Sequence, residues 1–265
     1  MREGLGELEF VNGVGAMSAS GTYGDVRICA AMVGKVDLRL GDGVEEVLAS
    51  YQARAPERFR GIRHMAAWDA SPEVSSIRLT TPADLLLDPD FRKGYAVLGR
   101  MGISFDAWLF HPQLPQLIDL IDAVPDTPVI LNHLGGRTER GPYAGKSREI
   151  FESWRKSIVE LARRPNVTIK LGGIGMASSG LGFPERALPP TSDDLVAAWK
   201  PYVATCIEAF GVGRAMFESN FPVDKTSCSY RVLWNAFKKI AAGCSAAEKA
   251  RLFAGTAMDV YRISL

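Results

Sequence analysis

The sequence predicts an α/β fold in which helices cover a parallel sheet. From about residue 26, short apolar segments typical of strands alternate with amphipathic segments typical of helices, as in successive βαβ units. The strand segments are apolar almost without interruption, as expected of strands buried on both faces. Because 265 residues suffice for one large domain, we expect residues 1–265 to form a single domain.

Six segments have the composition of buried strands: residues 26–38, 59–66, 103–110, 127–133, 166–173 and 214–220. The segment that precedes the first of them, residues 12–24, is rich in Gly and Ser. It is predicted to be an active-site loop or a flexible linker. The Gly- and Pro-rich residues 175–194 are predicted to form either a lid or a surface excursion.

Helical segments lie between the strands. One apolar stripe runs from Ile150 to Leu161 at helical spacing, and another runs from Leu195 to Phe210, with an expected kink at Pro201. Ser245 and Glu248 form the pattern of a capping box, which predicts the start of a C-terminal helix.

Composition and charge exclude several classes of function. Hydrophobic residues make up 47% of the chain and charged residues 23%, as in ordinary globular proteins. A net charge of +1 gives no electrostatic reason to expect a nucleic acid or a membrane as partner. No apolar run has the length of a transmembrane helix, and the four cysteines are scattered as in a reduced, cytoplasmic protein. Nucleotide-binding glycine motifs and a G-x-S-x-G nucleophile motif are both missing from the sequence.

The ends of the predicted strands are polar, and all three histidines of the protein occur there. The residues at these ends are Arg63, His64, His111, Asn132, His133, Lys170, Ser219 and Asn220. A (β/α)8 barrel builds its active site from the carboxyl ends of successive strands, whereas an open nucleotide-binding sheet carries a glycine motif that this chain lacks. The pattern therefore favours a barrel in which at least two histidines line a shared site.

The residue types at these ends suit a small-molecule site. An imidazole can bind a metal or transfer protons at neutral pH, and Arg63 can hold a carboxylate with two hydrogen bonds. Lys170 alternates with apolar neighbours, so it is predicted either to stabilise an oxyanion or carboxylate or to form an ion pair at the rim. Trp68 can stack against an unsaturated ring, while Trp108, inside a strand, is more typical of a core residue.

Four motifs together resemble the amidohydrolase-related (amidohydrolase family 2) TIM-barrel hydrolases, and most closely the branch of sugar-lactone and dicarboxylate-lactone hydrolases. The motifs are FRGIRH (59–64), FDAWLFHPQLPQLIDLIDAVPDTPVILNHLGG (105–136), RPNVTIKLGGIG (164–175) and FGVGRAMFESNFPVDK (210–225). The resemblance extends from about residue 58 to the C-terminus. It implies that His111 and His133 end the fifth and sixth barrel strands. Residues 26–38 would then be the third strand, so we expect an N-terminally incomplete barrel without the first two βα units.

The resemblance implies a hydrolase that opens a small lactone, or a related ester or amide, by attack of water. The implied substrate contacts are Arg63, His64, Trp68, Lys170 and Ser219, and the implied metal ligands are His111 and His133. Two alternatives are a decarboxylase of an aromatic or unsaturated acid and a catalytically inactive barrel fragment that serves as a binding or oligomerisation module. We expect a homo-oligomer that acts on a small molecule.

Two departures from the family pattern affect the expected chemistry. The first-strand His-x-His pair of the family has no counterpart here, which predicts one divalent metal, zinc-like, or none. Asn220 stands where the family carries an aspartate at the end of its last strand, and an amide is not a general base. Glu218, on the same strand face, and Asp224, in the following loop, are predicted to take over that role. The predicted catalytic residues are His111, His133, Glu218, Asn220 and Asp224.

Overall fold

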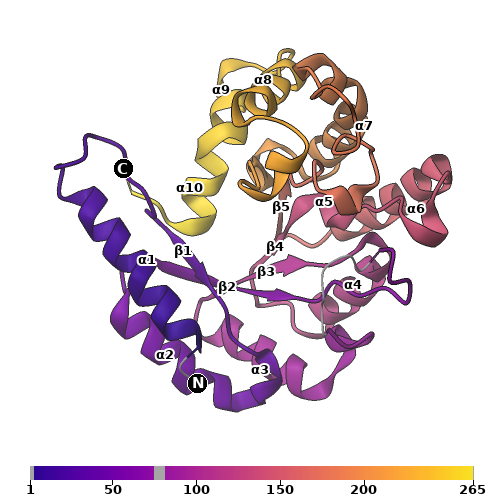
Figure 1. The fold of residues 1–265 in the computed structure, drawn as a ribbon. Coiled ribbons are helices and arrows are strands. Elements are labelled where there is room, and N and C mark those ends of the chain that lie inside the picture. The colour runs from indigo at the N-terminus through magenta and orange to yellow at the C-terminus, as the bar shows by residue number, and fades with distance from the viewer. Residues whose placement is uncertain (1–2, 75–80, 265) are drawn as a thin grey trace.

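The computed structural model describes residues 3–74 and 81–264 and consists of one parallel sheet with surrounding helices (Figure 1). The six strands are hydrogen-bonded in the order of the chain. They are β1 (Met32–Gly34), β2 (Phe59–Met65), β3 (Ser104–Trp108), β4 (Val129–Leu131), β5 (Val167–Leu171) and β6 (Ala215–Phe217). The helices are α1 (Glu3–Ala19), α2 (Val44–Arg54), α3 (Pro89–Arg100), α4 (Leu114–Ala123), α5 (His133–Gly136), α6 (Ser147–Leu161), α7 (Ser192–Phe210), α8 (Tyr230–Ile240), α9 (Ala246–Ala250) and α10 (Thr256–Tyr261).

Each predicted strand segment contains a strand, which confirms the α/β class and the parallel sheet. The first strand is much shorter than the predicted 26–38. Val26 and Ile28 are mostly exposed, and the pairing register shifts between Met32 and Val33, so regular pairing is limited to three residues. In the described part of the chain the sheet has six strands and leaves β1 and β6 as its edges, whereas a closed (β/α)8 barrel has eight.

The prediction of a loop over residues 12–24 was wrong, because residues up to Ala19 belong to α1. Two of the glycines of α1, Gly4 and Gly15, let the helix lie close to its neighbours. A Cβ atom at Gly15 would lie 2.8 Å from Nε of Arg58, and one at Gly4 would collide with the hydroxyl of Tyr51. Composition suggested a flexible segment, but close packing accounts for Gly4 and Gly15.

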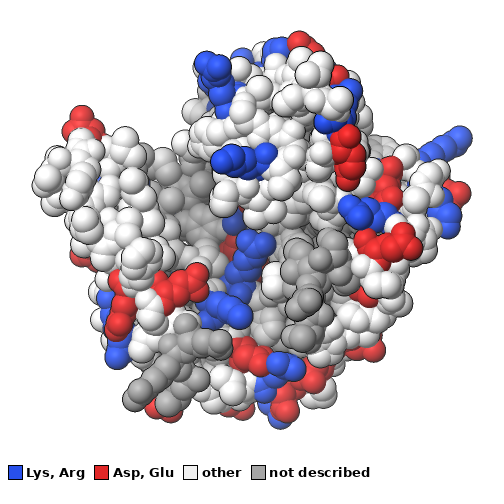
Figure 2. Space-filling view, viewed as in Figure 1, with Lys and Arg blue, Asp and Glu red and all other residues white. Residues whose placement is uncertain are grey.

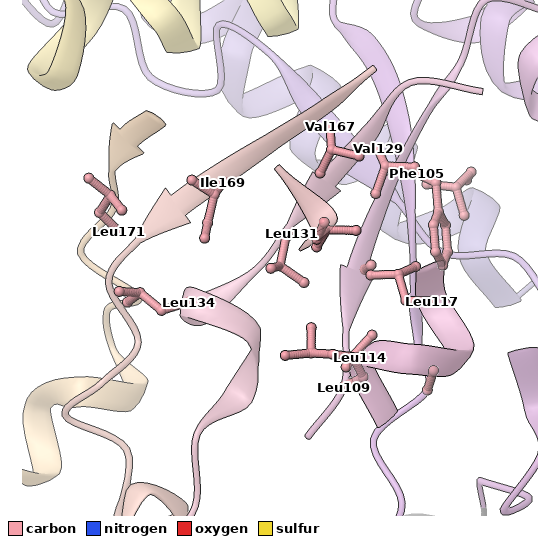
Figure 3. Packing of buried hydrophobic residues seen from close by; sticks show 14 of the residues in the cluster. Phe105, Leu109, Leu114, Leu117, Val129, Leu131, Leu134, Val167, Ile169 and Leu171 are labelled. Carbon is pink, nitrogen blue, oxygen red and sulfur yellow. The ribbon is translucent and has the colours of Figure 1, made fainter. Parts of the chain in front are cut away.

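The two faces of the sheet differ. One face, the helix-covered face, carries apolar side chains that pack against the helices; Val129, Leu131, Val167 and Ile169 lie near Leu114 and Leu117 of α4 in Figure 3. The opposite face, called here the inner face, carries the alternate residues of the same strands. On it lie Arg63, Asp106, Trp108, Ile130, Lys170 and Met216.

Helix α10 covers part of the inner face. Tyr261 packs with Ile130 and Met216, and α10 lies in Figure 1 on the side of the strands opposite α2 and α3. The end of the chain thereby reaches the middle of the sheet. Among the described residues, none of the helices is both long and apolar enough to cross a membrane.

Candidate active site

The centre of the candidate site is a histidine–carboxylate pair formed by residues that follow two different strands. His133 comes just after β4 and Glu218 just after β6. Nδ1 of His133 lies 2.6 Å from Oε1 of Glu218, and the backbone N–H of His133 donates to the same oxygen at 3.2 Å. The imidazole is buried, and the Glu218 side chain is 16% exposed. The pair therefore lies at the boundary between the core and solvent.

Arg63 determines which ring nitrogen carries the proton. Its Nη2 atom lies 3.1 Å from Nε2 of His133. Because a guanidinium only donates hydrogen bonds, Nε2 must accept, so Nδ1 carries the proton and donates to Glu218. The imidazole thus presents Nε2 as an acceptor and is oriented from behind by a carboxylate, as in other histidine bases.

The backbone that presents His133 is unusual. His133, Leu134, Gly135 and Gly136 have φ angles of 54°, 50°, 74° and 58°, so the turn labelled α5 is left-handed. A left-handed conformation costs roughly 1–2 kcal/mol for each residue other than glycine, and such strain is concentrated at functional sites. A Cβ atom at Gly136 would collide with the carbonyl oxygen of Leu109. The close approach of these segments therefore requires glycine at this end of the turn.

Three glycines that follow β5 lie directly against the site residues. A Cβ atom at Gly172 would lie 2.6 Å from Cγ of Glu218. At Gly173, where φ is +67°, it would collide with Nδ1 of His133. At Gly175 it would lie 2.9 Å from Oδ2 of Asp224. The LGGIG motif thus allows the loop after β5 to cover the pair, a role that sequence reasoning had not assigned to it.

A second polar cluster adjoins the pair on the inner face. Nζ of Lys170 donates to Oδ1 of Asp106 at 2.7 Å and lies 4.0 Å from Oε2 of Glu218. Oδ1 of Asp106 also accepts from Nδ2 of Asn132 and from the hydroxyl of Tyr261, both at 2.9 Å. Of the two predicted roles of Lys170, the structure shows the ion pair. Asp106 and Tyr261 were missed, although a charged residue within the apolar strand SFDAW was a visible signal.

These contacts keep both Glu218 and Lys170 charged. Burial alone would raise the pKa of Glu218, but His133 and Lys170 outweigh it and lower the pKa to about 2. Burial alone would lower the pKa of Lys170, but Asp106, Tyr261 and Glu218 hold it above its ordinary value. At neutral pH Glu218 is therefore a carboxylate and Lys170 an ammonium ion.

Asn220 supports a carboxylate rather than replacing one. Its Nδ2 donates to Oδ1 of Asp224 at 2.7 Å, and the backbone N–H of Gly175 donates to Oδ2 at 3.2 Å. Asp224 is fully buried, and burial raises its pKa to about 7 despite these two donors. The hydroxyl of Ser219 accepts from the N–H of Phe221 at 3.3 Å, within the same turn. Asp224 thus joins the loops that follow β5 and β6.

The prediction that His64 lines the shared site was wrong. Consecutive strand residues point to opposite faces, so Arg63 is on the inner face and His64 on the helix-covered face. Nδ1 of His64 accepts from the N–H of Leu38 at 3.4 Å, and its ring contacts Phe91 edge to face at 5.2 Å. The sequence correctly placed His64 near the end of a strand, but it did not show to which face of the sheet the side chain points.

The contacts of His111 differ from those of His133. It is buried at the start of the turn before α4, with its ring centroid 5.5 Å from that of Tyr143. Burial, followed by the charge of Arg137, lowers the pKa of His111 to about 4, so the imidazole is neutral. Trp108, an aromatic residue of the inner face, has its ring centroid 6.3 Å from that of His133. Trp68, in the loop after β2, donates its backbone N–H to Oε1 of Gln113 in the turn after β3.

The donors around His133 do not suit a divalent metal. Zinc in proteins takes at least three side-chain ligands. The described residues contain no group of three His, Cys, Asp or Glu side chains that could hold a metal ion. Nε2 of His133 faces the Arg63 guanidinium, and Glu218 is paired with His133 and Lys170. Both groups are therefore paired with protein cations. Figure 2 shows Lys and Arg side chains gathered in the hollow at the centre of this view.

Comparison with known proteins identifies the family. The amidohydrolase family profile matches residues 16–263. The chain belongs to the amidohydrolase family. This amidohydrolase is 38% identical over 232 residues to the uncharacterized protein y4mH of Sinorhizobium fredii, with 88% of this chain and 69% of that protein covered. It is 27% identical over 245 residues to an L-fucono-1,5-lactonase of Burkholderia multivorans, with 88% and 72% covered. The resemblance to the lactone hydrolase branch is thereby confirmed.

The solved structures confirm the fold class of this amidohydrolase. A crystal structure of a Burkholderia multivorans amidohydrolase with bound zinc superposes with a TM-score of 0.76 at 26% identity, covering 98% of this chain and 80% of that one. The six-stranded sheet therefore belongs to the TIM-barrel superfamily of amidohydrolases. Zinc is a property of that relative.

Proposed function

We propose that this amidohydrolase opens small lactones, with the sugar-acid lactones as the first class to test, and uses His133 as the general base. The observation that carries the proposal is the arrangement of one imidazole between a carboxylate and a guanidinium. Glu218 binds Nδ1 of His133 at 2.6 Å, and Arg63 lies 3.1 Å from Nε2. This arrangement provides a basic nitrogen beside a fixed positive charge, which is what attack of water on an ester carbonyl requires.

In the proposed reaction, a water molecule takes the place of the guanidinium as the partner of Nε2 of His133. The water oxygen attacks the carbonyl carbon while Nε2 removes a proton, and Arg63 stabilises the negative charge that develops on the carbonyl oxygen. The intermediate then collapses as the bond between the carbonyl carbon and the ring oxygen breaks. His133 gives its proton to that ring oxygen, and the product is an open-chain hydroxy acid.

The other charged residues support this role. Glu218 stabilises the imidazolium that forms when Nε2 takes a proton, as the carboxylate of a catalytic triad does. Lys170, 4.0 Å from Oε2 of Glu218, adds positive charge to the same site. Asn220 and Asp224 act by holding the loop that follows Glu218. In this proposal His133 is the base, and neither Glu218 nor Asp224 removes a proton directly.

The test is a panel of sugar-acid 1,4- and 1,5-lactones, with L-fucono-1,5-lactone included because related proteins bear that name. Acid release is followed with a pH indicator and compared with spontaneous hydrolysis. His133→Asn should lower kcat/KM at least about 100-fold on any active substrate. His64→Asn is the matched control, because His64 lies on the other sheet face, and it should retain activity.

Two results would contradict the proposal: no lactone hydrolysed faster than in buffer, or equal activity of His133→Asn and the unchanged protein. The decarboxylase alternative is checked in parallel by measuring carbon dioxide release from aromatic and unsaturated acids.

A further inference from the structure

Tyr261, in the last turn of α10, reaches the inner face of the sheet from the end of the chain. It is buried among Ile130 and Met216, and its hydroxyl donates to Oδ1 of Asp106 at 2.9 Å and lies 3.2 Å from Oδ2. Asp106 is 1% exposed and lies on β3, 155 residues earlier in the chain. A buried carboxylate needs several donors, so this hydroxyl is part of what keeps Asp106 in place.

Asp106 in turn determines where the Lys170 ammonium lies. Oδ1 of Asp106 holds Nζ of Lys170 at 2.7 Å, and the ammonium also lies 5.4 Å from the centre of the Tyr261 ring. The other close carboxylate of Lys170 is Glu218, at 4.0 Å. The ammonium therefore lies between two carboxylates, and its distance from each depends on how firmly Asp106 is held.

We infer that Tyr261 is a positioning residue for the His133–Glu218 pair, acting through Asp106 and Lys170. Without the hydroxyl, Asp106 keeps its charge but loses one of the donors that hold it in place. The carboxylate and the Lys170 ammonium bound to it then shift, which changes the distance between the ammonium and Glu218. The electrostatic potential at Glu218 changes with that distance, and so does the hydrogen bond that Glu218 accepts from Nδ1 of His133.

The inference rests on the proposed function for its catalytic meaning, but the first measurement does not require a substrate. In Tyr261→Phe the ring and its packing remain and only the hydroxyl is lost. The chain has three histidines, so their imidazole signals can be resolved by NMR with labelled histidine and assigned with His133→Asn. We expect Tyr261→Phe to displace the Nδ1–H resonance of His133.

Tyr51→Phe is the matched control. Tyr51 is also buried, and its hydroxyl donates one hydrogen bond, to the carbonyl oxygen of Lys35 at 2.9 Å, but it lies on α2 away from the inner face. It should lose similar stability and leave the His133 resonance unchanged. An unchanged resonance in Tyr261→Phe, or equal displacement in both variants, would overturn the inference.

The second measurement uses any lactone found to be hydrolysed. Tyr261→Phe should lower kcat about tenfold with little change in KM, whereas Tyr51→Phe should leave both constants unchanged. Unchanged kcat in Tyr261→Phe would also overturn the inference. If the unchanged protein hydrolyses no lactone, the proposed function fails, and the NMR comparison still decides whether Tyr261 positions His133.

Discussion

Nδ1 of His133 and Oε1 of Glu218 are 2.6 Å apart, although 85 residues separate them in the chain. Their strands, β4 and β6, are not neighbours in the sheet, since β5 lies between them. The contact is possible because the loop after β5 passes close to both side chains on glycines rather than on larger residues. The pair is thus a product of the strand order and of the LGGIG motif together.

Glu218→Gln should lower kcat of the proposed reaction about 100- to 1,000-fold with a smaller effect on KM. A glutamine keeps the shape of the side chain but removes the charge that stabilises protonated His133. Steady-state kinetics on an active lactone checks this. Glu208→Gln, at an exposed position on α7, is the control and should have the same kcat and KM as the unchanged protein. Equal activity of the two variants would show that Glu218 has no catalytic role.

Gly173→Ala should destabilise the protein by more than about 2 kcal/mol and abolish activity. The added methyl group meets Nδ1 of His133 and also disfavours a φ angle of +67°. Gly182→Ala separates the two causes, because Gly182 has a φ of +70° but open space around its Cβ position. That variant should lose only about 1 kcal/mol. Denaturant unfolding of both variants measures the difference, and equal losses would mean that the contact with His133 is unimportant.

The sequence was sufficient to predict the strands and the positions at which polar residues leave them. Alternation of apolar and amphipathic segments reports burial, and burial is what determines the six strands here. It did not predict α1, because Gly-rich composition is the same for a flexible segment and for a helix that must lie close to Tyr51 and Arg58. Local composition does not distinguish these cases without knowledge of the neighbours.

The site was predicted only in part for a related reason. Arg63, His133, Lys170 and Glu218 were all named, and they do lie together. His64 was placed on the wrong face because the apolar and polar residues near the end of β2 do not alternate regularly. Tyr261 was missed since nothing in the local sequence of α10 indicates that the helix returns to the middle of the sheet.

Removal of metal ions should leave the activity of this chain unchanged. Nε2 of His133 already faces a guanidinium, and the described residues contain no group of three metal-ligating side chains. Dialysis against a chelator, followed by assays with and without added zinc, checks this. Metal content measured by mass spectrometry provides an independent readout. A stoichiometric metal ion whose removal abolishes activity would contradict the prediction.

Asp224→Asn should make stability less dependent on pH. The pKa of Asp224 in the folded protein is about 7, above its ordinary value of 3.8, because the carboxyl group is buried. The folded state therefore binds the proton more tightly than the unfolded state, so stability falls as the pH rises from about 4 to 7. The asparagine variant lacks this loss, which is on the order of 4 kcal/mol over that pH range. Denaturant unfolding at pH 5 and pH 8 tests it, with the exposed Asp126→Asn as control.

Asn220→Asp should destabilise the protein at pH 8 and should not increase activity, although it restores the carboxylate that is typical of the family. Nδ2 of Asn220 is a donor 2.7 Å from Oδ1 of Asp224, and an aspartate would place a second acceptor there. Two carboxylates at that distance cannot both be ionised without cost, so one proton would be shared between them.

The expected loss is about 1–3 kcal/mol at pH 8 and less at pH 5, where the shared proton restores a hydrogen bond. Unfolding at both pH values measures this difference, and Asn235→Asp, at an exposed position on α8, is the control for an added charge. A variant that is equally stable at pH 8 and more active than the unchanged protein would show that Asn220 is a lost general base. The hydrogen bond to Asp224 argues instead that the asparagine is required as a donor.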